Sequence, residues 1–138
     1  MAEISIDRSK RHTDLLNVLT SAGSQFGTMR DALLFAAGLG YSIQRQEELG
    51  DTHSDSIRIS VFQNKPLAID LISMLAAVVS GDPEIVLDKN FDKSVGIFSR
   101  YAAGGLDHIA ERAGTKLSDA DEVVRTILNE HLMQASKR

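Results

Sequence analysis

The chain has 138 residues and a formal net charge of −4, and it contains neither cysteine nor tryptophan. Without cysteine it can form no disulfide, thiolate zinc site or cysteine nucleophile, which fits a reducing cytoplasm. No segment approaches the roughly 18 apolar residues that span a bilayer, and no secretory leader is evident. We therefore expect a single cytoplasmic globular domain over residues 1–138, with a strand-helix-helix unit at 1–48, a strand and helices at 56–135, and a frayed tail at 134–138.

The N-terminal segment predicts a short strand followed by a basic helix. Residues 4–6 alternate apolar and polar side chains, and Ser9 can cap a helix from about residue 10 to residue 21. The first turn of this helix is basic, although the helix dipole favours acidic residues there. These cations are either simply exposed or positioned to meet a nucleic-acid backbone. The candidate phosphate-binding residues are Arg8, Lys10, Arg11, His12 and Arg30.

An apolar helix is predicted from residue 29 to about residue 46. Thr28 can cap it, Asp31 stands three residues further on in the capping-box position, and residues 32–41 carry no charge. Its small residues suggest that another backbone packs closely against it. That neighbour belongs either to the same chain or to a second copy.

Residues 57–62 alternate in polarity and predict a second strand that pairs with residues 4–6. Two strands form only a marginal ribbon, so they must pack on helices or pair again across a dimer. The residues that we expect at a dimer or partner interface are Ile4, Ile6, Ala36, Ala37 and Gly40.

The C-terminal half predicts further helices. The helix that follows Pro66 is apolar nearly all round, which indicates a second core helix. A later helix is expected to bend or break at Gly104 and Gly105, and Ser118 is expected to cap a last amphipathic helix. The predicted fold is mainly α, with five or six helices around a central apolar helix and a short two-stranded β ribbon that a dimer could complete.

Motifs for catalysis are missing from the sequence. It has no Gly-x-Ser-x-Gly elbow, no Gly-x-x-x-x-Gly-Lys phosphate loop and no His-Glu-x-x-His pair. The carboxylates Asp82, Glu84, Asp88 and Asp92 could in principle bind magnesium, but two of them are already explained as helix caps. We therefore expect no catalytic residue, no metal site and no cofactor.

Several segments together resemble a known family. They are residues 4–6 with Lys10-Arg-His12, the helix that ends in Phe-Ala-Ala-Gly-Leu-Gly-Tyr41, and Gly81-Asp-Pro-Glu-Ile85 with residues 97–106. The arrangement is similar to that of the small proteins encoded beside bacterial DNA phosphorothioation (Dnd) modification and restriction genes. The resemblance implies a cytoplasmic protein of an anti-phage defence locus, and it implies no particular activity.

The N-terminal order of strand, helix, turn and helix is also similar to that of ribbon-helix-helix DNA-binding proteins. The outward residues of this strand would be Glu3, Ser5 and Asp7, however, whereas a ribbon that reads bases needs basic or amide side chains.

Three functional hypotheses follow. The first is a non-enzymatic accessory or regulatory subunit that forms a homodimer and contacts other proteins of the same locus. The alternative is a subunit that binds double-stranded DNA through the basic N-terminal helix. The third is a small metal-dependent hydrolase or nuclease.

Overall fold

The computed structural model describes residues 4–52, 56–63 and 67–136. Within these residues the fold is mainly α, as predicted, with six α-helices and one two-stranded antiparallel sheet. The strands are β1 (Ser5–Ile6) and β2 (Ile57–Arg58), and the α-helices are α1 (Thr13–Thr20), α2 (Met29–Ser42), α3 (Ile59–Gln63), α4 (Ala68–Ser80), α5 (Phe91–Ala113) and α6 (Ala120–Ser136). Short 3₁₀ turns lie at Lys10–His12, Pro83–Val86, Asp88–Asn90 and Leu117–Asp119.

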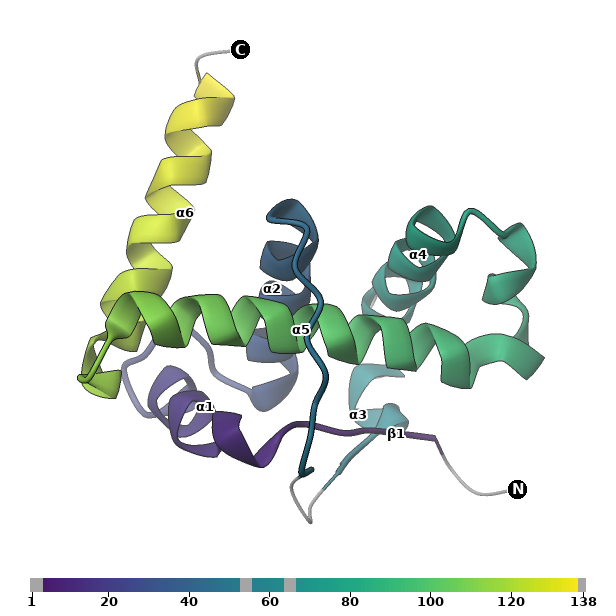
Figure 1. The fold of residues 1–138 in the computed structure, drawn as a ribbon, viewed down its shortest axis with the longest axis horizontal. Coiled ribbons are helices and arrows are strands. Elements are labelled where there is room, and N and C mark those ends of the chain that lie inside the picture. The colour runs from purple at the N-terminus through teal and green to yellow at the C-terminus, as the bar shows by residue number, and fades with distance from the viewer. Residues whose placement is uncertain (1–3, 53–55, 64–66, 137–138) are drawn as a thin grey trace.

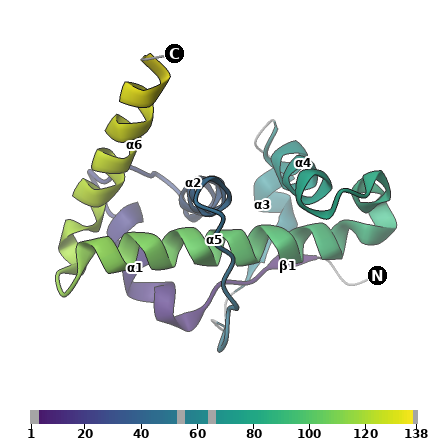
Figure 2. The same ribbon diagram turned by 45° about the horizontal axis from the view of Figure 1, so that its top comes forward.

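The helix at the centre of the fold is α5 rather than the predicted α2. It runs the length of the molecule, with α4 and α6 towards its opposite ends and α2 between them (Figures 1 and 2). The prediction of a bend at Gly104 and Gly105 is wrong, because α5 is continuous. A Cβ atom at Gly105 would lie 2.0 Å from the carbonyl oxygen of Ala36, so this glycine admits the backbone of α2.

A second backbone crosses α5 at Gly104. Residues 43–52 leave the end of α2 and cross α5 (Figure 1), and a Cβ atom at Gly104 would lie 2.0 Å from the carbonyl oxygen of Arg45. The helix α2 ends earlier than predicted because Gln44 adopts a left-handed backbone conformation with φ of 56°. Helix α2 and the segment that follows it therefore both pack closely against the backbone of α5.

Two predicted helix caps are confirmed. The Oγ1 atom of Thr28 accepts a hydrogen bond from the backbone N–H of Asp31 at 3.2 Å, and the Oγ atom of Ser9 accepts one from the N–H of Arg11 at 3.3 Å. Each side chain thus satisfies a backbone donor that has no partner inside the helix.

The predicted pairing of the N-terminal strand, β1, with the central strand, β2, is confirmed. Ser5 lies opposite Arg58, and Ile6 lies opposite Ile57. The second strand is shorter than predicted, because residues 59–63 form α3. Ile59 and Phe62 are both buried and stand three residues apart, which is the spacing of one helical face. A strand would have buried Val61 with Ile59, but Val61 is exposed.

Helix α4 buries only one of its apolar faces. Ala68, Ile72 and Ala76 are buried at four-residue intervals, and the helix packs on α5. The prediction that this helix is covered nearly all round is wrong, because large apolar side chains on another face are exposed to solvent. No described helix has both the length and the apolar character needed to cross a membrane.

Candidate functional site

Arg11, a candidate phosphate-binding residue, is held inside the chain by five hydrogen bonds. Its Nε and Nη2 atoms each lie 3.1 Å from one carboxylate oxygen of Asp107 on α5. The same guanidinium donates to the backbone carbonyls of Glu48 and Leu49, at 2.8 and 2.7 Å, and to the Oγ atom of Ser9. Because its donors are engaged in this way, Arg11 joins the N-terminus and the segment after α2 to α5.

His12 is buried beside the same carboxylate, with only 2% of its surface exposed. Its Nε2 atom lies 2.6 Å from Oδ1 of Asp107. Burial lowers the pKa of His12 below its ordinary value, and the hydrogen bond to Asp107 offsets this effect only in part. Burial alone would raise the pKa of Asp107, but the hydrogen bonds from Arg11 and His12 together bring it below its ordinary value. We therefore describe the pair as a neutral imidazole that donates to an ionised carboxylate.

The other predicted basic residues do not form one surface with these two. Arg30 donates to the backbone carbonyl of Val61 at 3.1 Å and to Asp31 at 3.4 Å. Of the five predicted phosphate-binding residues, Arg11, His12 and Arg30 therefore bond within the chain. Lys10 is exposed, and Arg8 is partly buried.

A polar hollow of about 360 Å³ lies beside β1 and the segment after α2. The charged side chains that line it are Asp7, Glu48, Asp92 and Arg100, so carboxylates outnumber cations. A phosphate group would meet net repulsion there.

The residues predicted for a dimer interface pack mostly inside the chain. Ile6, Ala36 and Ala37 are almost fully buried, and a Cβ atom at Gly40 would lie 2.0 Å from the carbonyl oxygen of Tyr101 on α5. Ile4 is partly buried, and its carbonyl accepts a hydrogen bond from the N–H of Ile59. The close neighbour that the small residues predicted is thus α5 of the same chain.

The carboxylates considered for a metal site do not gather into one. Asp82 caps the turn that follows it, with Oδ1 accepting the N–H of Glu84 at 3.0 Å. Asp82, Glu84 and Asp92 are exposed, whereas the side chain of Asp88 lies outside the part that the structure describes. Over the part of the chain that the structure describes, no three histidines or carboxylates come close enough to hold a metal ion.

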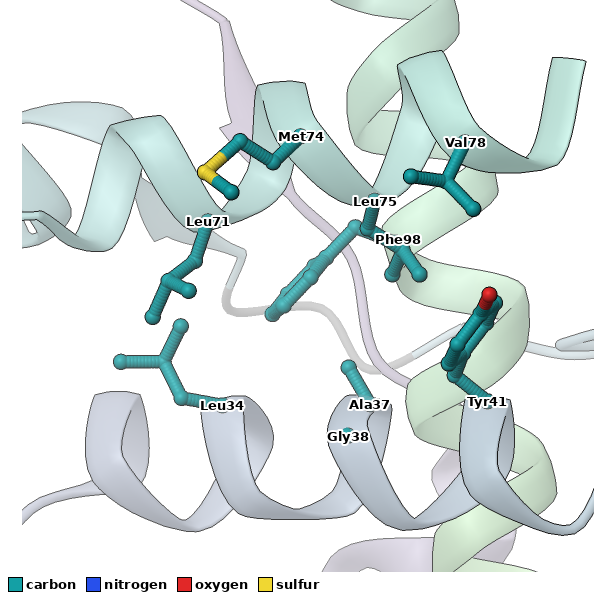
Figure 3. A pocket seen from close by; sticks show the side chains of 9 residues that line it. All are labelled: Leu34, Ala37, Gly38, Tyr41, Leu71, Met74, Leu75, Val78 and Phe98. Carbon is teal, nitrogen blue, oxygen red and sulfur yellow. The ribbon is translucent and has the colours of Figure 1, made fainter. Parts of the chain in front are cut away.

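The most pronounced hollow of apolar character is a groove of about 340 Å³ between α2 and α4 (Figure 3). Leu71, Met74 and Val78 of α4 form one wall, and Phe98 of α5 lies between the two helices (Figure 3). The remaining lining residues, from α2 and α4, are Leu34, Ala37, Gly38, Tyr41 and Leu75. Among all these residues the Tyr41 hydroxyl is the one strongly polar side-chain group. We call this hollow the α2–α4 groove.

A second apolar hollow, of about 270 Å³, lies on the other side of α2, where α6 contributes Ile127 and His131. It shares Leu34 and Gly38 with the α2–α4 groove. The outer surface of α2 is therefore an apolar floor between the two hollows, and Figure 2 shows α2 end-on between α4 and α6.

Comparison with known protein families identifies the family of this chain. The model of DNA sulphur modification system-associated protein 4 matches residues 5–138. The chain belongs to this family. The resemblance to Dnd-associated proteins that the sequence predicted is thereby confirmed. No curated protein and no solved structure was found to match.

In this member of the DNA sulphur modification system-associated protein 4 family, the sequence patterns did not identify the α2–α4 groove. They drew attention to the basic N-terminus, whereas the α2–α4 groove was assigned to the core. A signal for the groove was present, because α4 carries two apolar stripes. One consists of Ala68, Ile72 and Ala76, and the other of Leu71, Met74 and Val78.

Proposed function

We propose that this chain is a non-enzymatic accessory or regulatory subunit of a bacterial DNA sulphur modification system of the Dnd type, linked to anti-phage defence. It works by binding protein rather than by catalysing a reaction. Membership of the family supports the link to the modification system. The observation that carries the protein-binding role is the α2–α4 groove, whose wall residues Leu71, Met74 and Val78 are 51%, 62% and 63% exposed.

The chemistry of the groove favours protein contact. Soluble proteins seldom leave contiguous apolar side chains of this size in water unless a partner covers them. A catalytic site would need a nucleophile, an acid–base pair or a metal, and the groove lining offers only the Tyr41 hydroxyl. The buried His12 and the more exposed Arg11 both bond to Asp107, elsewhere in the fold.

Affinity capture from a host that carries the sulphur modification genes tests this proposal. Tagged wild-type chain is expected to retain proteins of the same system, and Met74→Glu is expected to lose them, because it places a charge on the apolar wall. Met133→Glu is the matched control, since Met133 on α6 is 61% exposed and Met74 is 62% exposed. Equal capture by all three proteins would contradict the assignment of the contact to the groove.

Binding of DNA through the N-terminal helix is the second candidate, and exposed Lys10 favours it. The internal bonds of Arg11 and His12 count against it, as does the acidic hollow beside β1. Under this alternative, duplex binding would weaken steeply with salt and fall on Lys10→Glu substitution. A gel shift at low salt that shows no complex, with modified or unmodified duplex, would remove it.

A further inference from the structure

The exposed wall of the α2–α4 groove has the spacing of a helix-packing seam. Leu71, Met74 and Val78 of α4 follow one another at intervals of three and four residues, and Leu67, the residue directly before α4, stands four residues earlier. All four are among the most exposed large apolar residues of the described chain. Alternation of three- and four-residue steps places apolar side chains along one line of a helix, where they pack between the side chains of a second helix. The groove is therefore shaped for a helix.

The opposite wall lets a helix approach closely. Apart from the neighbouring backbone of α2 itself, no atom of the described residues lies within 4 Å of the position that a Cβ atom would take at Gly38, in the middle of α2. Glycine lowers the stability of a helix interior relative to alanine. The close approach of α5 explains Gly40 of the same helix, but no contact within the described chain explains Gly38. A helix from outside the chain, packed over Gly38, would account for it.

We infer that the helix seated in the α2–α4 groove is α4 of a second copy of this chain, so that the groove is a homodimer interface. This inference rests on the proposal that the groove binds protein, and it names that protein. Around a two-fold axis perpendicular to α4, the two α4 helices run antiparallel. Leu71 then faces Met74 of the second copy, and Leu67 faces Val78, while each α4 also covers the partner's α2 at Gly38.

The charge of α4 fits a second copy. In a two-fold interface each charged group near the axis meets its own equivalent, so charge there is repulsive. Residues 71–80 carry no charge at all, and Asp70 is the one charged residue of α4. A surface of this kind is complementary to itself, whereas it offers no group that would select a charged peptide or an anionic surface.

The apolar area that this surface exposes is also consistent with a homodimer interface. From their exposed fractions, the four seam residues present on the order of 400 Å² of apolar surface, about half of the 800 Å² that each partner buries in a stable complex. The partly exposed Leu34 and Tyr41 of the facing wall add to this area. Together the two walls approach the size of a specific dimer interface.

Sedimentation velocity of the purified, untagged chain over a dilution series from about 1 to 100 µM tests the inference. We expect a dimer that dissociates on dilution. Met74→Glu should raise the dimer dissociation constant at least about tenfold, because it sets two carboxylates near the axis. Met133→Glu, which changes an equally exposed methionine on α6, should leave the constant unchanged. A wild-type monomer at every concentration, or equal effects of both variants, would overturn the inference.

Covalent trapping provides a second test that does not depend on the stability of a charged variant. The chain has no cysteine, so Met74→Cys creates a single thiol close to the proposed axis. A bismaleimide with a spacer of about 8 Å, matched to the separation of packed helices, should give a covalent dimer of this variant and little or none of Met133→Cys. Trapping through Cys at position 133 alone would place the dimer contact elsewhere and contradict the inference.

The two proposals fail in different ways. If the wild-type chain is monomeric but captures system proteins in a manner that depends on Met74, the groove binds a different protein and only the homodimer is wrong. If the chain dimerises through Met74 but captures no system protein, the homodimer stands and the accessory role at this surface is wrong.

Discussion

The two faces of α2 carry similar residues and meet different neighbours. On one face, Ala36 and Gly40 lie against α5, so closely that a Cβ atom at Gly40 would overlap the carbonyl oxygen of Tyr101. On the other face, Gly38 meets no atom within 4 Å and forms part of an open apolar floor. Small residues in a helix therefore indicate close packing, but only the structure distinguishes a neighbour within the chain from a missing one.

The largest expected change in stability is at the face of α2 that packs against α5. Gly105→Ala would place a methyl group 2.0 Å from the backbone carbonyl oxygen of Ala36, where no side chain can rotate away. We expect α2 and α5 to separate and the free energy of unfolding to fall by about 3 kcal/mol. The midpoint of urea denaturation measures this loss. A variant as stable as the wild type would mean that the two helices are not in close backbone contact.

The polar contact between α5 and the N-terminal segment, through Asp107, should contribute somewhat less to stability. Asp107→Ala leaves the guanidinium of Arg11 and the imidazole of His12 without their shared acceptor. We expect a loss of about 2 kcal/mol, because partly buried donors remain unsatisfied. Glu111→Ala on the same helix is the matched control, since its ion pair with Arg45 is more exposed and should contribute well under 1 kcal/mol. Equal losses in urea denaturation would deny Asp107 its anchoring role.

The stability of the fold should depend on pH through the contact between His12 and Asp107. Burial lowers the pKa of His12 in the folded chain, so below the ordinary histidine pKa of 6.5 the unfolded chain takes up more protons than the folded chain does. Protonation thus favours unfolding, and stability should fall as the pH drops from about 7 towards 5. In His12→Gln, whose amide can still donate to Asp107, this fall should be smaller.

Denaturation midpoints of the wild type and His12→Gln, measured at several pH values, provide the comparison. The difference between the two proteins cancels the contributions of the other three histidines. Parallel curves would show that His12 does not titrate differently in the folded and unfolded chains.

The smallest expected change is a gain in stability, at the face of α2 that carries Gly38. Gly38→Ala adds a methyl group that meets no atom within 4 Å, so the folded chain is not strained. Alanine also favours the helix, and the monomer should gain up to about 1 kcal/mol of stability. Thermal denaturation at low concentration, where association is weakest, measures this gain. A loss similar to that of Gly105→Ala would show that the face is already covered.

The class of fold, the helix caps and the strand pairing could be predicted from the sequence. The caps at Ser9 and Thr28 were predictable because each depends on a few neighbouring residues. The pairing of β1 with β2 followed from two short apolar segments, although the second strand was predicted too long because alternation over residues 57–62 also suits one turn of helix.

Long-range relations were not predictable in the same way. Gly104 and Gly105 could be read equally as a break or as a contact, and the backbone that decides between them comes from α2 and the segment after it. The basic residues Arg11 and His12 resembled a phosphate site because their partner, Asp107, lies 95 or more residues away in sequence. The open stripe of α4 resembled core because apolar residues alone do not reveal which face lacks a cover.

The most direct measurement of the central claim, that the open face of α2 and α4 is a homodimer interface, is the mass of the wild type and of Gly38→Leu in solution. Light scattering at matched concentration, about 50 µM, should give the mass of two chains for the wild type and of one chain for Gly38→Leu. The variant should unfold at no lower urea concentration than the monomeric Met74→Glu chain, because its added side chain meets open space. One mass for both proteins, whether that of a monomer or of a dimer, would contradict the account.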